Sequence, residues 1–224
     1  MAPYFRFIEP PKTEEGKGSD VLDRIRNFPE GATAEDQMRE LMKVDPANVS
    51  EDDNYGVNKS AHEAIAYLYN IMEKDGPFDG IIGYSEGATI AATLLLHEQR
   101  RFETQGIPPM FKLALFFAGW PPMNPDLDAI VLADMSDLQI NIPTCHVSEY
   151  TRFLCLQFQR LILVSVGSLD PYLAGSLALY NVCDMDTAYL FDHAKGHTLP
   201  RDKDTVRELG DVLRLMIQNL EEEM

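Results

Sequence analysis

The stretch Gly83–Ala88 constrains the fold of this chain more than any other. It reads Gly-Tyr-Ser-Glu-Gly-Ala and lies between an apolar run, 78–82, and a helix-like segment, 89–96. A strand, G-x-S-x-G and a helix together predict a nucleophile elbow, whose sharp turn has room only for glycine two residues either side of the serine. The elbow would expose the Ser85 hydroxyl and place the backbone N–H of Glu86 at a helix N-terminus, where an oxyanion forms. An ordinary glycine-rich turn is the alternative interpretation.

Strands and helices are expected to alternate along the chain. Apolar runs predict strands, and apolar residues at helical spacing predict helices. The expected strands are 4–8, 78–82, 112–118, 140–147, 161–166 and 187–191, and the expected helices are 34–44, 60–74, 89–102, 127–132, 173–183 and 202–220. The helix at 60–74 would begin with a capping box formed by Ser60 and Glu63. This alternation predicts an α/β fold with a doubly wound, mostly parallel sheet.

Length and composition favour one domain over 1–224, with an irregular polar segment at 12–58. The 224 residues carry a formal net charge of −17, which disfavours nucleic acid and anionic membranes as partners. The most apolar stretch, 153–166, is too short to span a bilayer, and no secretory signal opens the chain. We therefore expect a cytoplasmic protein. Cys145, Cys155 and Cys183 match no zinc or redox spacing, so no metal or other cofactor is expected.

Two later residues complete a candidate catalytic triad with Ser85. A serine needs a base to take its proton, and the base needs a carboxylate to fix its tautomer. Asp170 follows the expected strand 161–166, and His197 follows the last expected strand. The order Ser85, Asp170, His197 is the chain order of α/β-hydrolases. His193 is the alternative base, and Asp192 and Asp202 are the alternative acids.

The loop Gly119–Met123 is expected to form one wall of a substrate pocket. In open α/β sheets, ligands bind outside the carboxyl ends of the strands, and this loop follows the expected strand 112–118. Trp120 and Met123 would provide apolar lining together with Tyr172 and Leu173, although Trp120 could instead cap the core. The helix residues His62 and His97 have no partner at metal-ligand spacing and are expected to be structural.

Cys145 and His146 are adjacent, but neighbouring strand residues point to opposite faces, which argues against a thiol nucleophile here.

Three motifs together give the chain a resemblance to a known family. They are the elbow at 83–88, Gly-Ser-Leu-Asp-Pro at 167–171 with Ser176 and Cys183 following, and His-x-x-Gly-His-Thr-Leu-Pro at 193–200. Over about 5–215 the chain resembles the fungal serine hydrolases, also called ovarian-cancer-gene-associated hydrolases. The resemblance implies an α/β-hydrolase, with Ser85 as nucleophile, Asp170 as acid and His197 as base. Family members are small esterases and thioesterases, and several fungal ones release polyketides from the carrier domain of a synthase.

The chain departs from the family pattern at two places. Family members open with a strand, a His-Gly loop and a helix before the strand that corresponds to 4–8, and that loop supplies a second oxyanion donor. Loss of one such donor costs about 10²–10³ in rate. In addition, residues 148–165 lie between two motifs that are almost directly connected in the family. Joining Val147 to Val166 would restore the family pattern. We expect a misplaced start and an unspliced intron, and a dominant transcript that encodes 148–165 would refute the second expectation.

These patterns predict a serine hydrolase that cleaves an acyl ester or a carrier-bound thioester. A polyketide-type acyl chain and a polyketide synthase partner are what the resemblance implies. A carboxylesterase for small esters is the alternative within the same class. A catalytically impaired hydrolase-fold protein that only binds its ligand is the alternative from another class.

Overall fold

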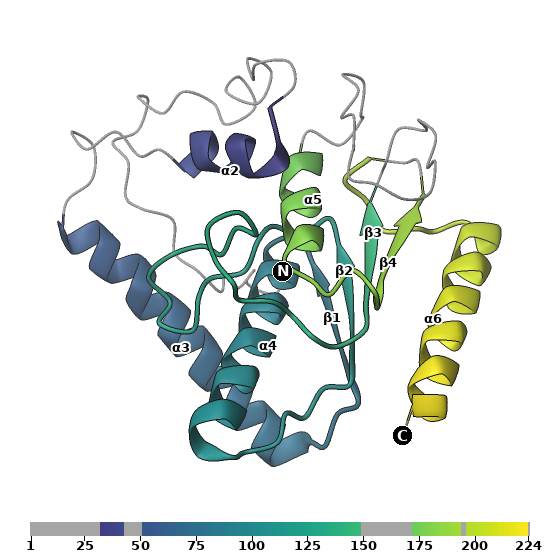
Figure 1. Cartoon of the computed structure of the whole chain (residues 1–224), viewed down its shortest axis with the longest axis horizontal. Helices are drawn as coiled ribbons and strands as arrows, with labels where there is room; N and C mark the ends of the chain where they lie inside the picture. Colours follow the sequence, from purple (N-terminus) through teal and green to yellow (C-terminus); the bar gives the residue numbers. More distant parts are fainter. Residues whose placement is uncertain (1–31, 43–50, 149–171, 194–195, 224) are drawn as a thin grey trace, which may run out of the picture.

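The computed structural model describes residues 32–42, 51–148, 172–193 and 196–223. These residues form helices and parallel strands in alternation over most of the chain (Figure 1). In chain order, the elements are α2 (Ala34–Met42), α3 (Glu51–Asp75), β1 (Gly80–Tyr84), α4 (Glu86–Gln105), β2 (Leu113–Phe117), β3 (Thr144–Ser148), α5 (Leu173–Asn181), β4 (Ala188–Asp192) and α6 (Lys203–Glu223).

The described strands form one parallel sheet in the order β1-β2-β3-β4. Their register runs from Gly80 opposite Leu113 to Tyr84 opposite Phe117, and β4 pairs with β3 along its whole length. Because the strands are parallel, the residues that follow β1, β2 and β4 emerge at the same edge of the sheet. That edge carries Ser85, Trp120 and His193. The predicted parallel α/β fold is confirmed.

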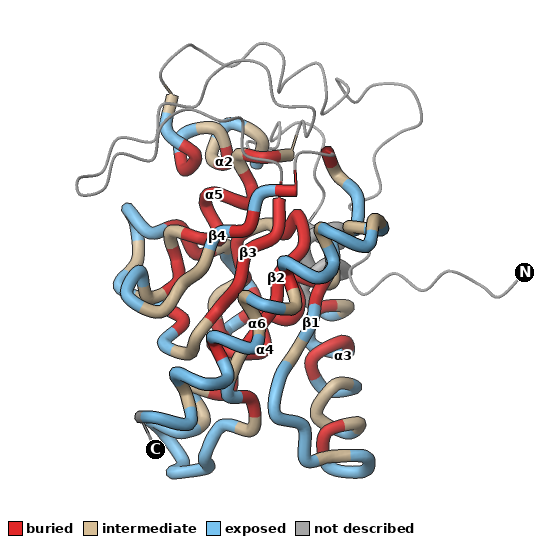
Figure 2. Tube along the Cα trace, turned by 90° about the vertical axis from the view of Figure 1, so that its right-hand side faces the viewer, coloured by how far each residue is buried: buried red, intermediate tan, exposed pale blue. Residues whose placement is uncertain are grey.

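Helices cover both faces of this sheet. Alternate residues of β2 face opposite sides: Ala114 and Phe116 belong to one buried cluster, and Leu115 and Phe117 belong to another. The first cluster is closed by α3, α4 and α5, and the second is closed by α6 (Figure 1). The central strands β2 and β3 are largely buried (Figure 2), whereas β1 and β4 are partly exposed. Burial on both faces explains why β2 reads as a continuous apolar run.

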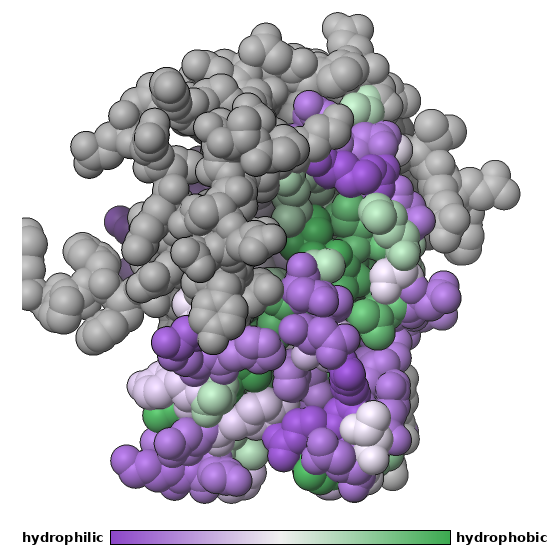
Figure 3. Space-filling model, turned by 90° about the vertical axis from the view of Figure 1, so that its left-hand side faces the viewer, coloured by the Kyte–Doolittle hydropathy of each residue, from purple (hydrophilic) through white to green (hydrophobic). Residues whose placement is uncertain are grey.

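The amphipathic character of α3 is as expected from the sequence. Ala61, Ala64, Ile65 and Met72 are buried on its inner face. Its outer face carries an exposed ion pair between Lys59 and Glu63. Figure 3 views the molecule from the side on which α3 lies in Figure 1, and much of the described surface there is hydrophilic.

The beginning of α3 was predicted wrongly. The helix begins at Glu51, so Ser60 lies inside it and forms no capping box. The stretch expected to be irregular, 12–58, is therefore helical from Glu51 onward.

The helix expected at 127–132 is also wrong. The chain instead forms a turn that brings Met123 and Ile130 together as an antiparallel bridge. The Asn124 side chain accepts a hydrogen bond from the Asp128 N–H at 3.2 Å, and Leu127 has a φ of 58°. Asparagine followed by proline favours turns because its side chain bonds to the backbone nearby. This local chemistry prevails over the apolar spacing.

Several expected features lie outside the described residues. They are the strands 4–8 and 161–166, the residues 149–165 of the expected insertion, and the acid Asp170. Ser148, which was assigned to the insertion, is the last residue of β3 and is opposite Asp192 of β4. Among the helices of the described part, none is both long and apolar enough to cross a membrane.

Candidate active site

Ser85 lies in a strained turn between β1 and α4. Its φ of 54° and ψ of −122° fall outside the regions that residues other than glycine normally adopt. Such strain costs about 1–3 kcal/mol and persists only where neighbouring structure holds it. Here the Ser85 N–H donates to the Phe117 carbonyl at 2.8 Å, and the Ser85 carbonyl accepts from the Ala88 N–H at 2.9 Å. The turn is therefore fixed to β2 on one side and to α4 on the other.

The two glycines of the elbow differ in what the structure requires of them. A Cβ added at Gly83 would lie 2.4 Å from the Ala88 Cα and 2.5 Å from the Gly87 carbonyl oxygen. Both are backbone atoms, so no side chain fits at Gly83 without moving the start of α4. A Cβ at Gly87 meets no atom within 4 Å. The expectation that sterics demand glycine at both positions is thus wrong for Gly87.

The ring of His197 faces the Ser85 hydroxyl. Its Nε2 lies 3.2 Å from the Ser85 Oγ, within hydrogen-bond distance. His197 belongs to the loop between β4 and α6, where Gly196 before it has a φ of 67°. This left-handed conformation suits glycine and allows the loop to turn back over the edge of the sheet. The arrangement allows the imidazole to take a proton from the serine.

Tyr84 supports His197 in two ways. Its hydroxyl donates a hydrogen bond to the His197 carbonyl at 3.1 Å, and the two rings lie 5.6 Å apart. Tyr84 is the residue before the serine in the elbow, and it ends β1. Sequence reasoning missed this role because the contact joins two distant parts of the chain. The only sequence signal is an aromatic residue with a hydroxyl at the variable position before the serine.

Tyr172 and Trp120 extend this aromatic group toward α5. Tyr172 packs edge-to-face on His197 at 5.1 Å, and its ring lies 5.9 Å from that of Trp120. The Thr89 hydroxyl donates a hydrogen bond to the Trp120 carbonyl and accepts one from the Trp120 N–H. The indole ring of Trp120 packs closely on Gly175 of α5. Trp120 is thus half-buried against α5 and also contacts a ring that touches His197. Both interpretations of Trp120 fit its position.

Met123 and Leu173 lie among buried apolar residues. Met123 packs on the main core, and its N–H donates to the Thr93 hydroxyl, which is about 12 Å along α4 from Ser85. Leu173 is buried in a cluster with Ala34 and Met38 of α2. Both side chains therefore pack in the core.

Glu86 is the first residue of α4, directly after the serine. The first N–H groups of a helix have no partner within the helix and carry the positive end of its dipole. The Glu86 N–H therefore occupies the position expected of an oxyanion donor. The Glu86 side chain is exposed.

The other candidate residues take different positions. His193 is buried, and its N–H donates to the Ser148 carbonyl at 3.3 Å. The Asp202 carboxylate accepts from the Thr205 N–H at 2.9 Å and so caps the start of α6. Asp192 is the last residue of β4 and is exposed.

Cys145 and His146 point to opposite faces of β3, as expected. Cys145 packs in the cluster beneath α6, whereas the His146 ring contacts Phe116 and Tyr180 on the other face. Burial raises the pKa of Cys145 to about 12 and lowers the pKa of His146 to about 3. A thiol that stays protonated cannot act as a nucleophile at neutral pH.

A strained serine between a parallel strand and a helix, faced by a histidine from a later loop, is typical of the α/β-hydrolases. The family model described as "Serine hydrolase (FSH1)" matches residues 47–209. Because the match spans more than half of the chain, the chain belongs to this serine hydrolase family.

Known relatives agree with this membership. "Esterase FUS5" of Gibberella moniliformis is 31% identical over 154 residues, which are 68% of this chain and 52% of that protein. "Family of serine hydrolases 2" of Saccharomyces cerevisiae is 28% identical over 156 residues, 67% of this chain and 59% of that protein. "Hydrolase phiM" of a fungal species is 28% identical over 160 residues, 70% of this chain and 67% of that protein. The chain spans about half the length of the first of these relatives.

Proposed function

We propose that this chain is a serine esterase or thioesterase that forms an acyl intermediate on Ser85. The observation that carries the proposal is the 3.2 Å distance between the His197 Nε2 and the Oγ of the strained Ser85. A strained serine and a histidine at hydrogen-bond distance are the two parts of an activated nucleophile. The relatives named esterases support an ester as substrate.

In the first half of the reaction, Ser85 Oγ attacks the acyl carbonyl carbon while His197 Nε2 takes the hydroxyl proton. Negative charge then collects on the former carbonyl oxygen, next to the Glu86 N–H at the start of α4. When this intermediate collapses, the alcohol or thiol leaves with the proton from His197. Acyl-Ser85 remains, and water activated by His197 then releases the acid and restores the serine.

We assign the acid of the triad to Asp170, which lies outside the described residues. Its role would be to accept a hydrogen bond from the His197 Nδ1–H and so fix the tautomer in which Nε2 takes the proton. Support for this assignment comes from chain order and from the resemblance of the motif at 167–171 to the family pattern.

The substrate that we propose is an acyl ester or a carrier-bound thioester with an apolar, polyketide-type chain. Tyr172 and Trp120 support an apolar chain because their rings extend from His197 along α5. Met123 and Leu173 would support the rings of Tyr172 and Trp120 from the core side, since both residues are packed in the core. A polyketide synthase as partner rests on the family resemblance alone.

Hydrolysis of a matched ester and thioester with the same acyl chain tests this function. We expect both to be hydrolysed by the wild-type protein, and the faster one identifies the class of leaving group. The control Ser85→Ala should abolish both activities while leaving the melting temperature within about 2 °C of wild type, because the hydrogen bonds that fix the turn use only the backbone of residue 85. Equal hydrolysis by Ser85→Ala would contradict the proposal. Folded wild-type protein that hydrolyses neither substrate would favour a protein that only binds.

A further inference from the structure

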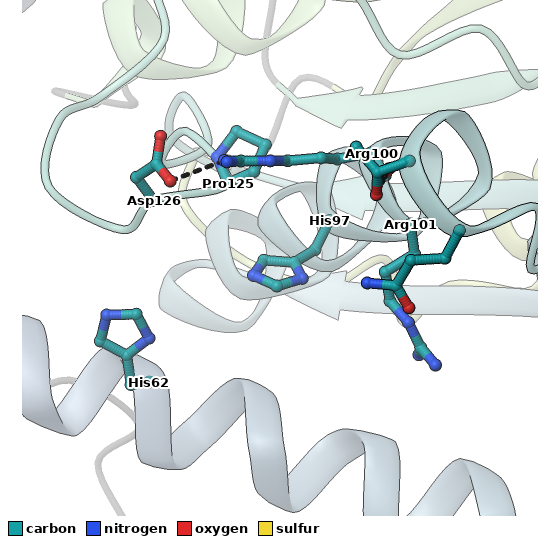
Figure 4. Close-up of a pocket in the computed structure, with 8 residues that line it drawn as sticks. His62, His97, Arg100, Arg101, Pro125 and Asp126 are labelled. Atoms are coloured by element: carbon teal, nitrogen blue, oxygen red, sulfur yellow. Dashed lines mark hydrogen bonds and ion pairs between the residues drawn. The ribbon is translucent and has the colours of Figure 1, made fainter.

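A second pocket lies at the other end of α4 from Ser85. It has a volume of about 310 Å³ and lies between α3, α4 and the turn after β2 (Figure 4). Its lining includes His62 of α3, His97, Arg100 and Arg101 of α4, and Asp126 of the turn. His97 follows Ser85 by about 18 Å along the helix axis, so the pocket is separate from the candidate active site.

The lining of this pocket is cationic, in contrast to the chain as a whole. The formal net charge of the chain is −17, yet two arginines and two histidines here face a single carboxylate. The lining residues carry two guanidinium groups and one carboxylate, and the buried Glu98 carboxylate interacts with Arg101 from beside the pocket. Protonation of either histidine therefore gives the pocket an excess positive charge. Such a concentration of positive charge favours an anion as the ligand.

Both guanidinium groups are held in place by neighbours. Arg100 forms an ion pair with Asp126 at 2.7 Å, and the Arg101 guanidinium lies over the Tyr69 ring at 4.3 Å from its centre. Stacking on an aromatic ring orients a guanidinium group and leaves its charge in place. Less conformational entropy is therefore lost when such a group binds an anion.

His97 provides a buried polar atom in the same pocket. Its Nδ1 is buried and has no hydrogen-bond partner among the described residues. Burial lowers the pKa of His97, the charges of Arg100, His62 and Arg101 lower it further, and a backbone hydrogen bond with Pro125 opposes the shift. An unpaired buried nitrogen is costly. When the ring is protonated, its Nδ1–H can donate to an oxyanion, whose negative charge also offsets the neighbouring positive charges. Its ring packs edge-to-face on Tyr69, at 6.0 Å.

We propose that this pocket binds the phosphate group of a small phosphorylated ligand or of free phosphate through Arg101 and His97, while Arg100, which points to Asp126, adds positive charge (Figure 4). Arginine matches phosphate because its planar fork donates two parallel hydrogen bonds. The volume of the pocket lies at the lower end of the range for small-molecule sites. A metal ion is the poorer candidate, because within the described part of the chain no three His, Cys, Asp or Glu side chains are grouped to hold one.

Titration of the full-length protein with inorganic phosphate, at constant ionic strength in chloride buffer, tests the proposal. The readout is the pKa of the His97 ring, followed by NMR. We expect phosphate to raise this pKa, because a bound anion stabilises the protonated ring against the opposing charges of Arg100, Arg101 and His62. Asp126 faces the same pocket and limits the affinity. An unchanged His97 pKa at saturating phosphate would overturn the proposal, as would binding of zinc without binding of phosphate.

Charge-matched variants separate a specific site from general electrostatics. We expect Arg101→Gln to weaken phosphate binding about tenfold or more, the usual effect of losing a hydrogen bond to a charged group. Arg101→Lys should bind with intermediate affinity, because it keeps the charge and loses the fork. The control is Arg207→Gln on α6, which removes the same charge from an exposed ion pair with Asp204. Equal weakening by the control would overturn the proposal.

A phosphate monoester distinguishes the two sources of the ligand. If phenyl phosphate binds more tightly than inorganic phosphate, the site takes an organic phosphate. If the two bind equally, it takes free phosphate, and either result supports the site. Ser85→Ala should bind phosphate as the wild type does, so this test is independent of the proposed hydrolase function.

Discussion

Replacement of Gly83 by alanine is the sharpest structural test of the elbow. The new Cβ would lie 2.4 Å from the Ala88 Cα, 2.5 Å from the Gly87 carbonyl oxygen and 2.7 Å from the Ala88 nitrogen. All three are main-chain atoms, so the start of α4 must move to admit the methyl group. Overpacking of this kind costs about 1–3 kcal/mol of unfolding free energy. For a chain of this size, that cost lowers the melting temperature by about 2–12 °C.

The same displacement would move Ser85, which lies between β1 and α4, and the N–H of Glu86, the first residue of α4. A misplacement of about 1 Å in a catalytic group can cost about 10² in rate. We therefore expect Gly83→Ala to lose at least that much ester hydrolysis. Thermal unfolding by circular dichroism and the initial rate of hydrolysis measure the two effects on one preparation.

Gly87→Ala is the matched control for stability. No atom lies within 4 Å of the Cβ that it would add, and the residue lies in the first turn of α4. Because alanine is the better helix former by up to about 1 kcal/mol, we expect an equal or higher melting temperature. The steric account fails if Gly87→Ala is as unstable as Gly83→Ala, or if Gly83→Ala melts and reacts like the wild type.

Three further predictions follow from the site and the core. Replacing His197 by glutamine should slow acylation of Ser85 by about 10²–10⁴, the usual contribution of a general base, and a rate near that of the wild type would exclude it as the base. Tyr84→Phe keeps the ring and loses the bond to the His197 carbonyl, so kcat should fall by about two- to tenfold with KM nearly unchanged; a change in KM alone would assign Tyr84 to binding. Because burial lowers the pKa of His146 from 6.5 to about 3, the unfolded chain takes up this proton first, and stability should fall as the pH drops from about 6.5 toward 3. The slope of unfolding free energy against pH should be smaller by up to about 1.4 kcal/mol per pH unit in His146→Gln, and equal slopes would refute this assignment.

Two strands of the parallel sheet could be predicted closely from the sequence. Apolar runs at 112–118 and 187–191 identified β2 and β4 to within about two residues, and burial on both faces explains the run of β2. Turns and helix ends depend on local bonds that apolar spacing does not reveal. The turn at Asn124 is decided by such a polar interaction. Both this turn and the start of α3 at Glu51 were predicted wrongly.

The candidate site could be predicted in part for a similar reason. Ser85 and His197 were predicted because an elbow and a glycine-preceded histidine leave local signatures, and the structure brings their side chains to 3.2 Å from each other. The contact of Tyr84 with His197, and the stacking of Arg101 on Tyr69, join residues that are distant or unremarkable in the sequence. Contacts of this kind depend on how the elements pack, so they were found only in the folded structure. The acid Asp170 stays a prediction.

Labelling with a fluorophosphonate probe tests the central claim most directly. The probe reacts covalently with an activated serine, and peptide mapping by mass spectrometry identifies the residue that carries it. We predict a single adduct on Ser85 of the folded protein, none on Ser85→Ala, and strongly slowed labelling of His197→Gln. An adduct on another serine, or no adduct on folded wild-type protein, would contradict the account that Ser85 is an activated nucleophile.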